Sequence, residues 1–590
     1  MDERLSRLEA KIDELVRALD RIESRLAILE ADAAGQATTP SQVLPAEGGP
    51  REDEPTLVTH AANHVLPLMG RSFLVLAGAW LLRALTDAGT LPQTAGVALG
   101  LAYAVAWFVL AARSPRTARL GAEFHGVTAA IIVYPLLYEA TTKFAVLAPP
   151  ASVVILTVLT GLGLVIAWRR LLPALAWAVT LGGLSAAFAS LVSTHAMELY
   201  AVFLVLLGVA AVWLSYERHW FGLRWITAAA ADLVVVEMVS LVSRPEGPPE
   251  AYRSLSAPGV EAVAVGLLVA YLGTIAVRTL LRRRDVNVFE AVQTIAALVV
   301  GFGGAVSVAH ALGSGGPSLG IAALLTAAAS YAVAFAFVDR RLGSPLNCVF
   351  YTSLALVFTL AGSLLLTTGL GLAFAWSALA VTAAALGGGF DRVTLRVHAV
   401  LYLLAAAVAS GFLSGVVAVF TRPLASPWGA LTAPGWLTTG GAVVCYVVLA
   451  VTRRHPTARG PAQIPHLSAA VLAALGIGAA LVLVLARPFV ATTGFADPAV
   501  MATVRTVVLA GTALLLAALG PRAGLVELTW LVYPVIVAGG IKLLAQDLPQ
   551  GRPATLVLAF VAYGVALMLS PRLLRHDHPD PPLHGSSPSS

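Results

Sequence analysis

The sequence predicts an all-α fold, a polytopic transmembrane helix bundle, and three observations support this prediction. Of the 590 residues, 58% are hydrophobic and only 12% are charged, about half the charged share of an average soluble protein. The mean hydropathy is +0.83. Apolar segments long enough to cross a bilayer recur from about residue 66 almost to the C-terminus.

Composition also excludes several classes of function. The net charge of +6 would suit a nucleic-acid partner only if basic residues gathered on one solvent-exposed surface. Instead they lie in short clusters between apolar segments. The two cysteines, Cys348 and Cys445, fall inside predicted spans, so neither a disulfide framework nor a zinc site is expected. We expect a lipid bilayer as the surroundings, and no nucleic acid, metal or cofactor.

Residues 1–30 are predicted to form a coiled-coil helix. Their apolar residues recur alternately three and four positions apart through four heptads, which is the a/d pattern of a coiled coil. These residues are Leu5, Leu8, Ile12, Leu15, Leu19, Ile22, Leu26 and Leu29. The segment is charged from its start, which is not the pattern of a signal peptide.

Flanking charges favour a parallel homo-oligomer through this helix. With Leu5 at position a, a parallel pair sets Arg4 against Glu9 and Arg25 against Glu30. An antiparallel pair would set basic residues against each other. Each exposed ion pair contributes only about 0–1 kcal/mol. The alternative is a single amphipathic helix lying on the membrane or on a loop of the same protein.

Three further regions follow the coiled coil. Residues 31–64, rich in Ala, Thr, Pro and Gly, are predicted to be a flexible linker, residues 65–574 a transmembrane helical domain, and residues 575–590 a disordered tail. Apolar runs bounded by charge, Gly or Pro predict about 18 spans in the helical domain. Their limits are 66–86, 92–112, 122–142, 148–168, 171–192, 197–215, 222–242, 259–278, 288–311, 317–338, 346–366, 369–388, 396–419, 436–452, 467–486, 499–519, 525–545 and 554–571.

The distribution of Lys and Arg orients the spans, because cytoplasmic loops carry an excess of these residues. If the N-terminus is cytoplasmic, the inner loops hold 21 of them and the outer loops six. Both termini are therefore predicted to face the cytoplasm. Since every outer loop is short, any chemistry must use groups within the helices or at their ends.

Two segments, 92–172 and 498–574, resemble each other and predict an internal repeat. Tyr134 corresponds to Tyr533, and a lysine follows each tyrosine nine residues later, although the chain has only three lysines. Each span of the second segment comes fourteen spans after its counterpart in the first, an even number, so both segments would cross the membrane in the same direction as a parallel repeat. Chance similarity between Ala- and Leu-rich helices is the alternative.

Ionisable side chains in the hydrocarbon cost several kcal/mol unless they are paired or hydrated, so they are candidate functional residues. Asp232 lies about 12 Å into its span when counted from Arg224, and Glu237 follows one and a half turns later. These two carboxyl groups predict a proton or cation site. A buried acid that is neutral or hydrogen-bonded is an equally weighted alternative.

A second candidate site joins the two repeats. Glu123 and Tyr134 lie eleven residues apart and therefore on one face of a helix. Pro135 frees a backbone carbonyl beside Tyr134, and Pro534 does the same beside Tyr533. Two such helices facing a common cavity would form a binding site. The alternative is that these prolines only shape the bundle.

One arginine, Arg505, is predicted to lie inside a span and to pair with a carboxylate. The candidate partners are Glu527, Asp232 and Glu237. The glycines of two GxxxG motifs, Gly96 with Gly100 and Gly411 with Gly415, indicate close helix packing. No catalytic sequence motif is found, so no catalytic residue is predicted.

The segment Gly70–Pro92, GRSFLVLAGAWLLRALTDAGTLP, follows a charged heptad helix and a linker rich in Pro and Ala. In this order, the features resemble a family of large bacterial polytopic membrane proteins with an N-terminal coiled coil, catalogued as a domain of unknown function. The resemblance covers the whole chain in architecture and is sharpest over residues 70–190. It implies a location in the bacterial cytoplasmic (inner) membrane and no agreed activity.

Three classes of function remain. A transporter or channel is favoured by the predicted repeat, the proline-broken helices and the intramembrane acids. A membrane scaffold that recruits partners through the coiled coil is the alternative. A membrane enzyme acting on a lipid-linked substrate, with Asp87 as its acidic group, fits least well, so an enzyme is the weaker expectation.

Overall fold

The chain divides into two units, residues 1–70 and 71–590. The computed structural model describes residues 57–218, 220–422, 431–453, 463–489 and 497–574. In the first unit, the described part is the beginning of one helix. The predicted coiled coil and C-terminal tail lie outside the described residues, as does the predicted linker as far as residue 56.

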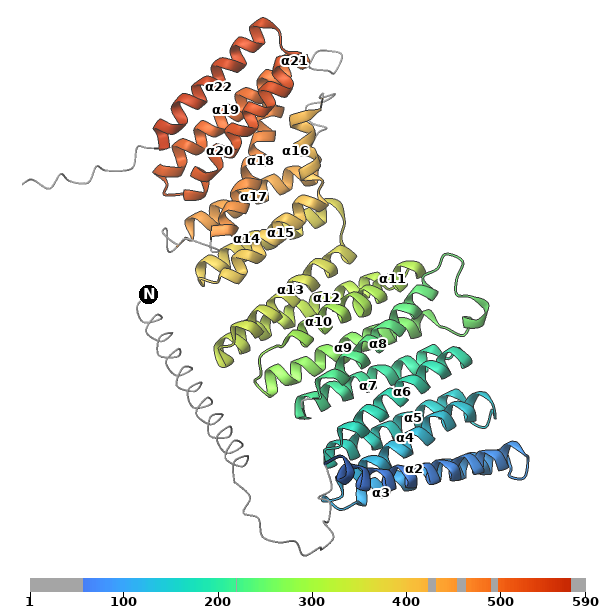
Figure 1. The fold of residues 1–590 in the computed structure, drawn as a ribbon. Coiled ribbons are helices and arrows are strands. Elements are labelled where there is room, and N and C mark those ends of the chain that lie inside the picture. Colours follow the sequence, from blue (N-terminus) through green and yellow to red (C-terminus); the bar gives the residue numbers. More distant parts are fainter. Residues whose placement is uncertain (1–56, 219, 423–430, 454–462, 490–496, 575–590) are drawn as a thin grey trace, which may run out of the picture. The chain divides into compact units, whose positions relative to one another are not determined.

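The described residues form helices and turns, and none of them lies in a β-strand. Figure 1 shows the helices in chain order. The first are α2 (Leu57–Asp87), α3 (Gln93–Arg113), α4 (Arg119–Thr142), α5 (Pro149–Arg170), α6 (Pro173–Thr194), α7 (Met197–Arg218), α8 (Phe221–Val242), the short η1 (Glu250–Tyr252), and α9 (Ala257–Ala276) with its π-helical extension η2 (Val277–Leu281).

The central helices include two further π-helical segments, η3 and η4. These helices are α10 (Val288–Ala297), η3 (Leu298–Phe302), α11 (Gly303–Leu312), α12 (Gly316–Ala332), η4 (Val333–Leu342), α13 (Pro345–Leu366), α14 (Gly369–Gly389), α15 (Val393–Ala409) and α16 (Phe412–Thr421). The last are α17 (Ala433–Val451), α18 (Ile464–Ala486), η6 (Arg487–Phe489), α19 (Pro498–Arg522), α20 (Val526–Lys542), the π-helical η7 (Leu543–Asp547), α21 (Leu548–Gln550) and α22 (Pro553–Leu574).

Helix boundaries follow the sequence. The helices α5, α6, α13, α19 and α22 each begin at a proline, whose fixed φ and missing N–H suit the first turn of a helix. Four helices end at an arginine, namely Arg113, Arg170, Arg218 and Arg522. Between such boundaries the side chains are almost entirely apolar, so each helix has the composition of a membrane span.

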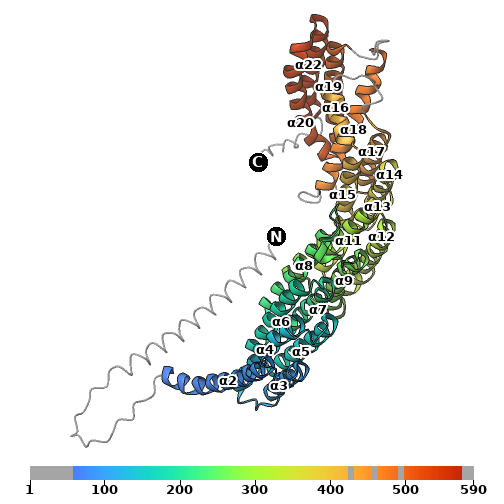
Figure 2. The same cartoon turned by 90° about the vertical axis from the view of Figure 1, so that its right-hand side faces the viewer.

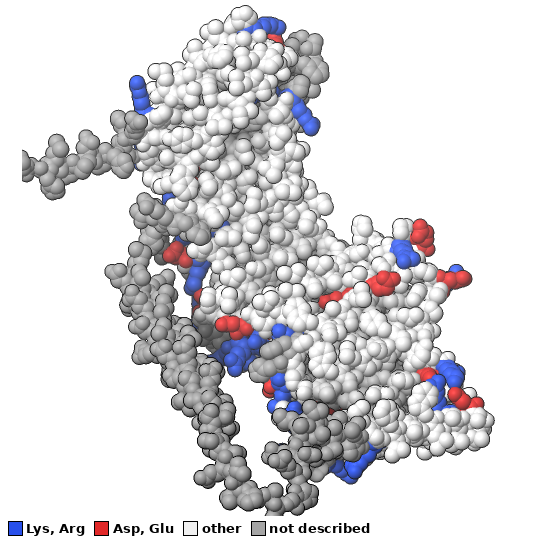
Figure 3. Space-filling view, viewed as in Figure 1, with Lys and Arg blue, Asp and Glu red and all other residues white. Residues whose placement is uncertain are grey.

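Sixteen of the described helices are long and apolar enough to cross a membrane. Many of their large apolar side chains are exposed, including Val154, Leu281 and Val299. On the face drawn in Figure 3, most charged side chains lie near the helix ends and the surface between them is largely uncharged. A water-soluble protein would not leave so much apolar surface uncovered. The chain is therefore a multi-pass membrane protein.

Two of the 18 predicted spans are not among these sixteen helices. The range 66–86 lies within α2, and the range 396–419 covers α15 and α16, which are bent by 62° relative to each other. Gly411 stands at this bend with φ +68°, a conformation that L-residues with a side chain rarely adopt. Interpreting Gly411 as a helix-packing glycine was therefore wrong, because it lies between two helices.

Helices in the second unit pack mainly on neighbours in the chain. Closely packed pairs include α3 with α4, α7 with α8, α12 with α13, α14 with α15, and α19 with α20. Substantial contacts join helices no more than three positions apart in chain order, such as α14 with α17 and α19 with α22. The colours accordingly run in order through this unit in both views (Figures 1 and 2).

Two hydrophobic cores account for most of the buried side chains. The first extends from Val75 to Phe358 and the second from Leu356 to Val508, so they meet at α13. The two predicted repeats belong to different cores: α3–α5 lie in the first, whereas residues of α19 and α20 lie in the second and in a small neighbouring cluster. The repeat stays a prediction.

Close backbone contact joins α12 to α13. A Cβ atom added to Gly362 would lie 2.8 Å from the carbonyl oxygen of Gly320, and one added to Gly320 would lie 3.1 Å from the carbonyl oxygen of Gly362. Neither backbone can give way without moving a whole helix. This is the small-residue packing by which membrane helices approach each other.

We predict that Gly362→Ala lowers the melting temperature of the purified protein in detergent by several degrees, because overpacking typically costs about 1–3 kcal/mol. Gly273→Ala on α9 is the matched control, since nothing lies within 4 Å of an added Cβ there. Equal melting temperatures for the two variants would contradict the packing argument.

Candidate functional site

Glu123 and Tyr134 share α4 but lie in different surroundings. The Tyr134 side chain is buried, and its hydroxyl is 3.2 Å from the hydroxyl of Thr160 on α5. Glu123 lies near the start of α4, where its carboxylate is 3.9 Å from the guanidinium of Arg119. Hydrogen bonding to a buried threonine is what a packed core tyrosine requires.

The carboxyl groups of the second predicted pair, Asp232 and Glu237, also lie in different surroundings. The Asp232 carboxylate accepts a hydrogen bond from the amide of Gln293 on α10, with N–O distances of 3.1 and 3.2 Å. Glu237 is exposed on the same helix. Asp232 is thus half-buried and hydrogen-bonded, and the proton or cation site stays a prediction.

Tyr533 and Arg505 occupy the C-terminal helices. Tyr533 is 60% exposed on α20 and does not face Tyr134, since α4 and α20 belong to different hydrophobic clusters. Arg505 is buried and donates to the backbone carbonyl of Arg422. Of its predicted partners, Glu527 instead pairs with Arg453 at 2.7 Å. The six predicted residues therefore lie on four helices and do not form one site.

A buried ionic cluster that the sequence analysis did not single out lies at one end of α7, α9 and α10. Glu290 is fully buried and lies 2.6 Å from the guanidinium of Arg278. Its carboxylate also accepts hydrogen bonds from the Tyr216 hydroxyl and from the backbone N–H of Asn287. The Asn287 side chain caps α10 in return, which completes a capping box. In the sequence, the spacing Asn-x-x-Glu before an apolar run indicates this capping box.

The two matching lysines of the predicted repeat have unlike environments. Lys143 is half-exposed and pairs with Asp87 at 2.9 Å. Lys542 is buried, 2.6 Å from the carboxylate of Asp547 and 2.7 Å from the hydroxyl of Thr506. Both side chains are ion-paired, so neither is an unpaired cation inside the membrane.

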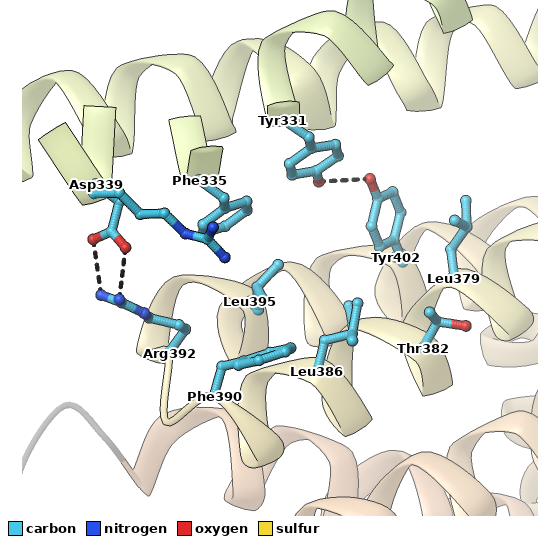
Figure 4. Close-up of a pocket in the computed structure, with 12 residues that line it drawn as sticks. Tyr331, Phe335, Asp339, Leu379, Thr382, Leu386, Phe390, Arg392, Leu395 and Tyr402 are labelled. Carbon is cyan, nitrogen blue, oxygen red and sulfur yellow. Dashed lines mark hydrogen bonds and ion pairs between the residues drawn. The ribbon is translucent and has the colours of Figure 1, made fainter. Parts of the chain in front are cut away.

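A cavity lined by polar and aromatic side chains, of about 460 Å³, lies between α12–η4 on one side and α14–α15 on the other (Figure 4). This volume is in the range of sites that bind small molecules. The walls are mainly apolar and aromatic. They include Phe335, Leu379, Leu386, Phe390 and Leu395.

Charged groups gather at one end of this cavity. The Asp339 carboxylate and the Arg392 guanidinium form a two-point ion pair with N–O distances of 2.6 and 2.9 Å. Arg340 also lines the cavity and forms no ion pair or hydrogen bond with the described residues. Since η4 ends at Leu342 and Arg392 precedes α15, this end lies near the helix termini and hence at the membrane surface.

Neutral polar groups occupy the other end, near Tyr331, which precedes Asp339 by eight residues in the chain. Here the Tyr331 hydroxyl lies 3.0 Å from the Tyr402 hydroxyl and 2.9 Å from Nδ1 of His398. Tyr402 and His398 are both buried. The cavity therefore combines a cationic mouth, an apolar wall and a hydrogen-bonding interior.

Local helix geometry positions these groups. The ten-residue π-helix η4 carries Phe335, Asp339 and Arg340, and π-helical segments recur at functional sites. Opposite it, Asp391 adopts φ +52° in the turn after α14, and its carboxylate accepts from Arg396 at 2.7 Å. This turn places Arg392 opposite Asp339. The lining residues come from positions 331–402 and share no sequence motif.

Comparisons of the chain with family models, curated proteins and solved structures found no match. Within the described residues, no group of three or more His, Cys, Asp and Glu side chains is placed to hold a metal ion. Function must therefore be argued from the geometry of this chain alone.

The buried cluster at Glu290 yields a stability prediction. Glu290→Gln should lower the melting temperature strongly, because it leaves Arg278 without its carboxylate, and breaking a buried ion pair costs about 3–5 kcal/mol. Glu217→Gln is the control, since Glu217 pairs with Arg282 where both side chains are exposed, and such pairs contribute about 0–1 kcal/mol. Thermal unfolding of the full chain in detergent measures both. Similar losses in the two variants would show that the Glu290 cluster is not stabilising.

Proposed function

We propose that this multi-pass membrane protein is a transporter that binds an anionic amphiphile in the cavity between η4 and α14. The observation that carries the proposal is the arrangement of the cavity, with arginines at its mouth and aromatic and apolar side chains behind them. Such a site fits a molecule with a negatively charged head and an apolar body. Free Arg340 is the group expected to bind the head.

Charge balance favours an anion over a cation. The mouth holds Arg340, Arg392 and one carboxylate, that of Asp339, which is already paired with Arg392. One positive charge is left without a partner in a region next to the membrane. An arginine in that position is well suited to a carboxylate or phosphate, because its planar fork matches their geometry.

The position of the cavity favours transport over static binding. It lies beside α13, where the two hydrophobic cores meet, and the Asp339–Arg392 pair and the Tyr331–Tyr402 contact connect helices on its two sides. Small relative movements at such a junction can expose or enclose a ligand. The predicted orientation, with both termini inside, would open the charged mouth to the cytoplasm.

The other two classes of function have less support. A scaffold role depends on residues 1–30, which lie outside the described residues. An enzyme acting at Asp87 would need that carboxylate to be available, whereas it pairs with Lys143. The location in a bacterial inner membrane and the membership of the uncharacterised family remain predictions from the sequence.

Removal of the free arginine tests the proposal. We expect Arg340→Gln to slow the transbilayer movement of a fluorescent phosphatidylglycerol about tenfold in vesicles of phosphatidylcholine containing the full chain, because a charge-assisted hydrogen bond contributes about 1.5–3 kcal/mol. The melting temperature of the Arg340→Gln variant should equal that of the wild type, since Arg340 has no ion pair or hydrogen bond with the described residues to lose. Fluorescent phosphatidylcholine is the comparison probe. An unchanged rate for the anionic probe would contradict the proposal.

Filling the cavity is an independent test. Leu386→Trp places a larger side chain on the wall of the cavity, so binding and movement of the anionic probe should both be lost. Leu370→Trp is the control, because Leu370 lies on the same helix, is exposed, and does not line the cavity. If both variants transported the probe at the wild-type rate, this cavity would not be the binding site.

A further inference from the structure

A second cavity, of about 420 Å³, is unusually rich in arginine. It lies between the turn that joins α3 to α4 and the turn that joins α5 to α6. Arg116, Arg119, Arg169 and Arg170 line it, together with Ser114. The site is formed by helices distant in sequence from η4 and α14, so it is separate from the transport site proposed above.

Two of the four arginines hold the cavity in shape. Arg119 donates to the backbone carbonyl of Leu171, which ties the start of α4 to the turn after α5. Arg170 donates to the carbonyl of Ala112, which ties the end of α5 to the end of α3. Leu171 itself adopts φ +61°, a conformation seldom taken by a residue with a side chain. The two turns are therefore fixed relative to each other.

The other two arginines have no partner. Arg116 and Arg169 are exposed and form no ion pair or hydrogen bond with the described residues. Among the described residues, the one carboxylate paired with any of the four is that of Glu123, which lies 3.9 Å from Arg119. Three positive charges around the cavity are thus left without a compensating negative charge.

Backbone groups add to this positive potential. The helices α4 and α6 both begin at the cavity, and neither has a side chain capping its N-terminus. The first N–H groups of a helix have no partner within the helix, and the helix dipole places a partial positive charge there. Uncapped helix N-termini next to arginines form a site suited to phosphate.

We propose that this cavity binds a phosphate-bearing group with at least two negative charges. Its lining also includes the apolar residues Ala122, Leu171 and Leu172, and it lies at the ends of four membrane helices. Both a lipid headgroup and a soluble phosphate compound carry the required chemistry. Basic cavities between membrane helices at the surface of a bilayer are typical sites for anionic lipid headgroups.

The test compares the unpaired arginines of the cavity with two arginines elsewhere. One variant combines Arg116→Gln with Arg169→Gln. The control combines Arg283→Gln with Arg284→Gln, which removes the same charge from an exposed turn that does not line the cavity. Neither variant breaks an ion pair among the described residues, so both should fold.

Melting temperatures of the full chain in a nonionic detergent are measured with cardiolipin, phosphatidylcholine or pyrophosphate added. We expect cardiolipin to raise the melting temperature of the wild type and the control, and its affinity for the Arg116/Arg169 variant to fall at least about tenfold. Stabilisation by pyrophosphate that also depends on Arg116 and Arg169 would identify a soluble phosphate as the source of the ligand. The proposal would be overturned if cardiolipin stabilised both variants equally. It would also be overturned if neither cardiolipin nor pyrophosphate stabilised the wild type. The outcome does not depend on Arg340, so failure here leaves the transport proposal intact.

Discussion

The backbone N–H and C=O groups of a membrane span cannot form hydrogen bonds with water, and the rest of the structure depends on this constraint. Each N–H and C=O group in the hydrocarbon must find its partner inside the chain, which only helices and closed barrels allow. In this protein, helices of about 20 residues satisfy the constraint one at a time. Each span can therefore form before its neighbours, and what remains for packing is to bring preformed helices together through small residues such as Gly320 and Gly362.

The same constraint explains where the charges lie. A charge within the hydrocarbon is tolerated only with a partner. The buried carboxylates Glu290, Glu527 and Asp547 each pair with a cation, Arg278, Arg453 and Lys542 respectively. Each of these pairs joins two helices or two turns of one helix. The few charges of the chain thus connect helix ends, and the arginines left without a partner stand out.

Helix positions were largely predictable from the sequence, because length and hydropathy determine a span without knowledge of its neighbours. Sixteen of the predicted ranges coincide with apolar helices, and Pro149 and Pro173 mark helix starts as their missing N–H requires. The bend at Gly411 was not predictable from composition, because GxxxG describes a packing face as readily as a break. Its positive φ is a property of the folded chain.

Side-chain partners were much less predictable. Arg505 was expected to pair with a carboxylate, but it donates to a backbone carbonyl, and Glu527 pairs with Arg453 instead. In an Ala- and Leu-rich helix, periodicity gives little information about which face meets which neighbour. The residues around the η4 cavity come from four segments and form a site only after α12 packs near α15. No spacing rule links such positions.

Local packing also determines where a ligand can bind. Helices contact mainly their neighbours in the chain. Residues far apart in sequence, such as Tyr134 and Tyr533, therefore do not come together in one site. Cavities form instead where neighbouring helices diverge, either beside the meeting point of the two cores or at the turns between short helical hairpins. The cavity at η4 and the arginine-lined cavity are of these two kinds. Both cavities have arginines at helix ends, and the planar guanidinium of an arginine matches the geometry of a carboxylate or phosphate.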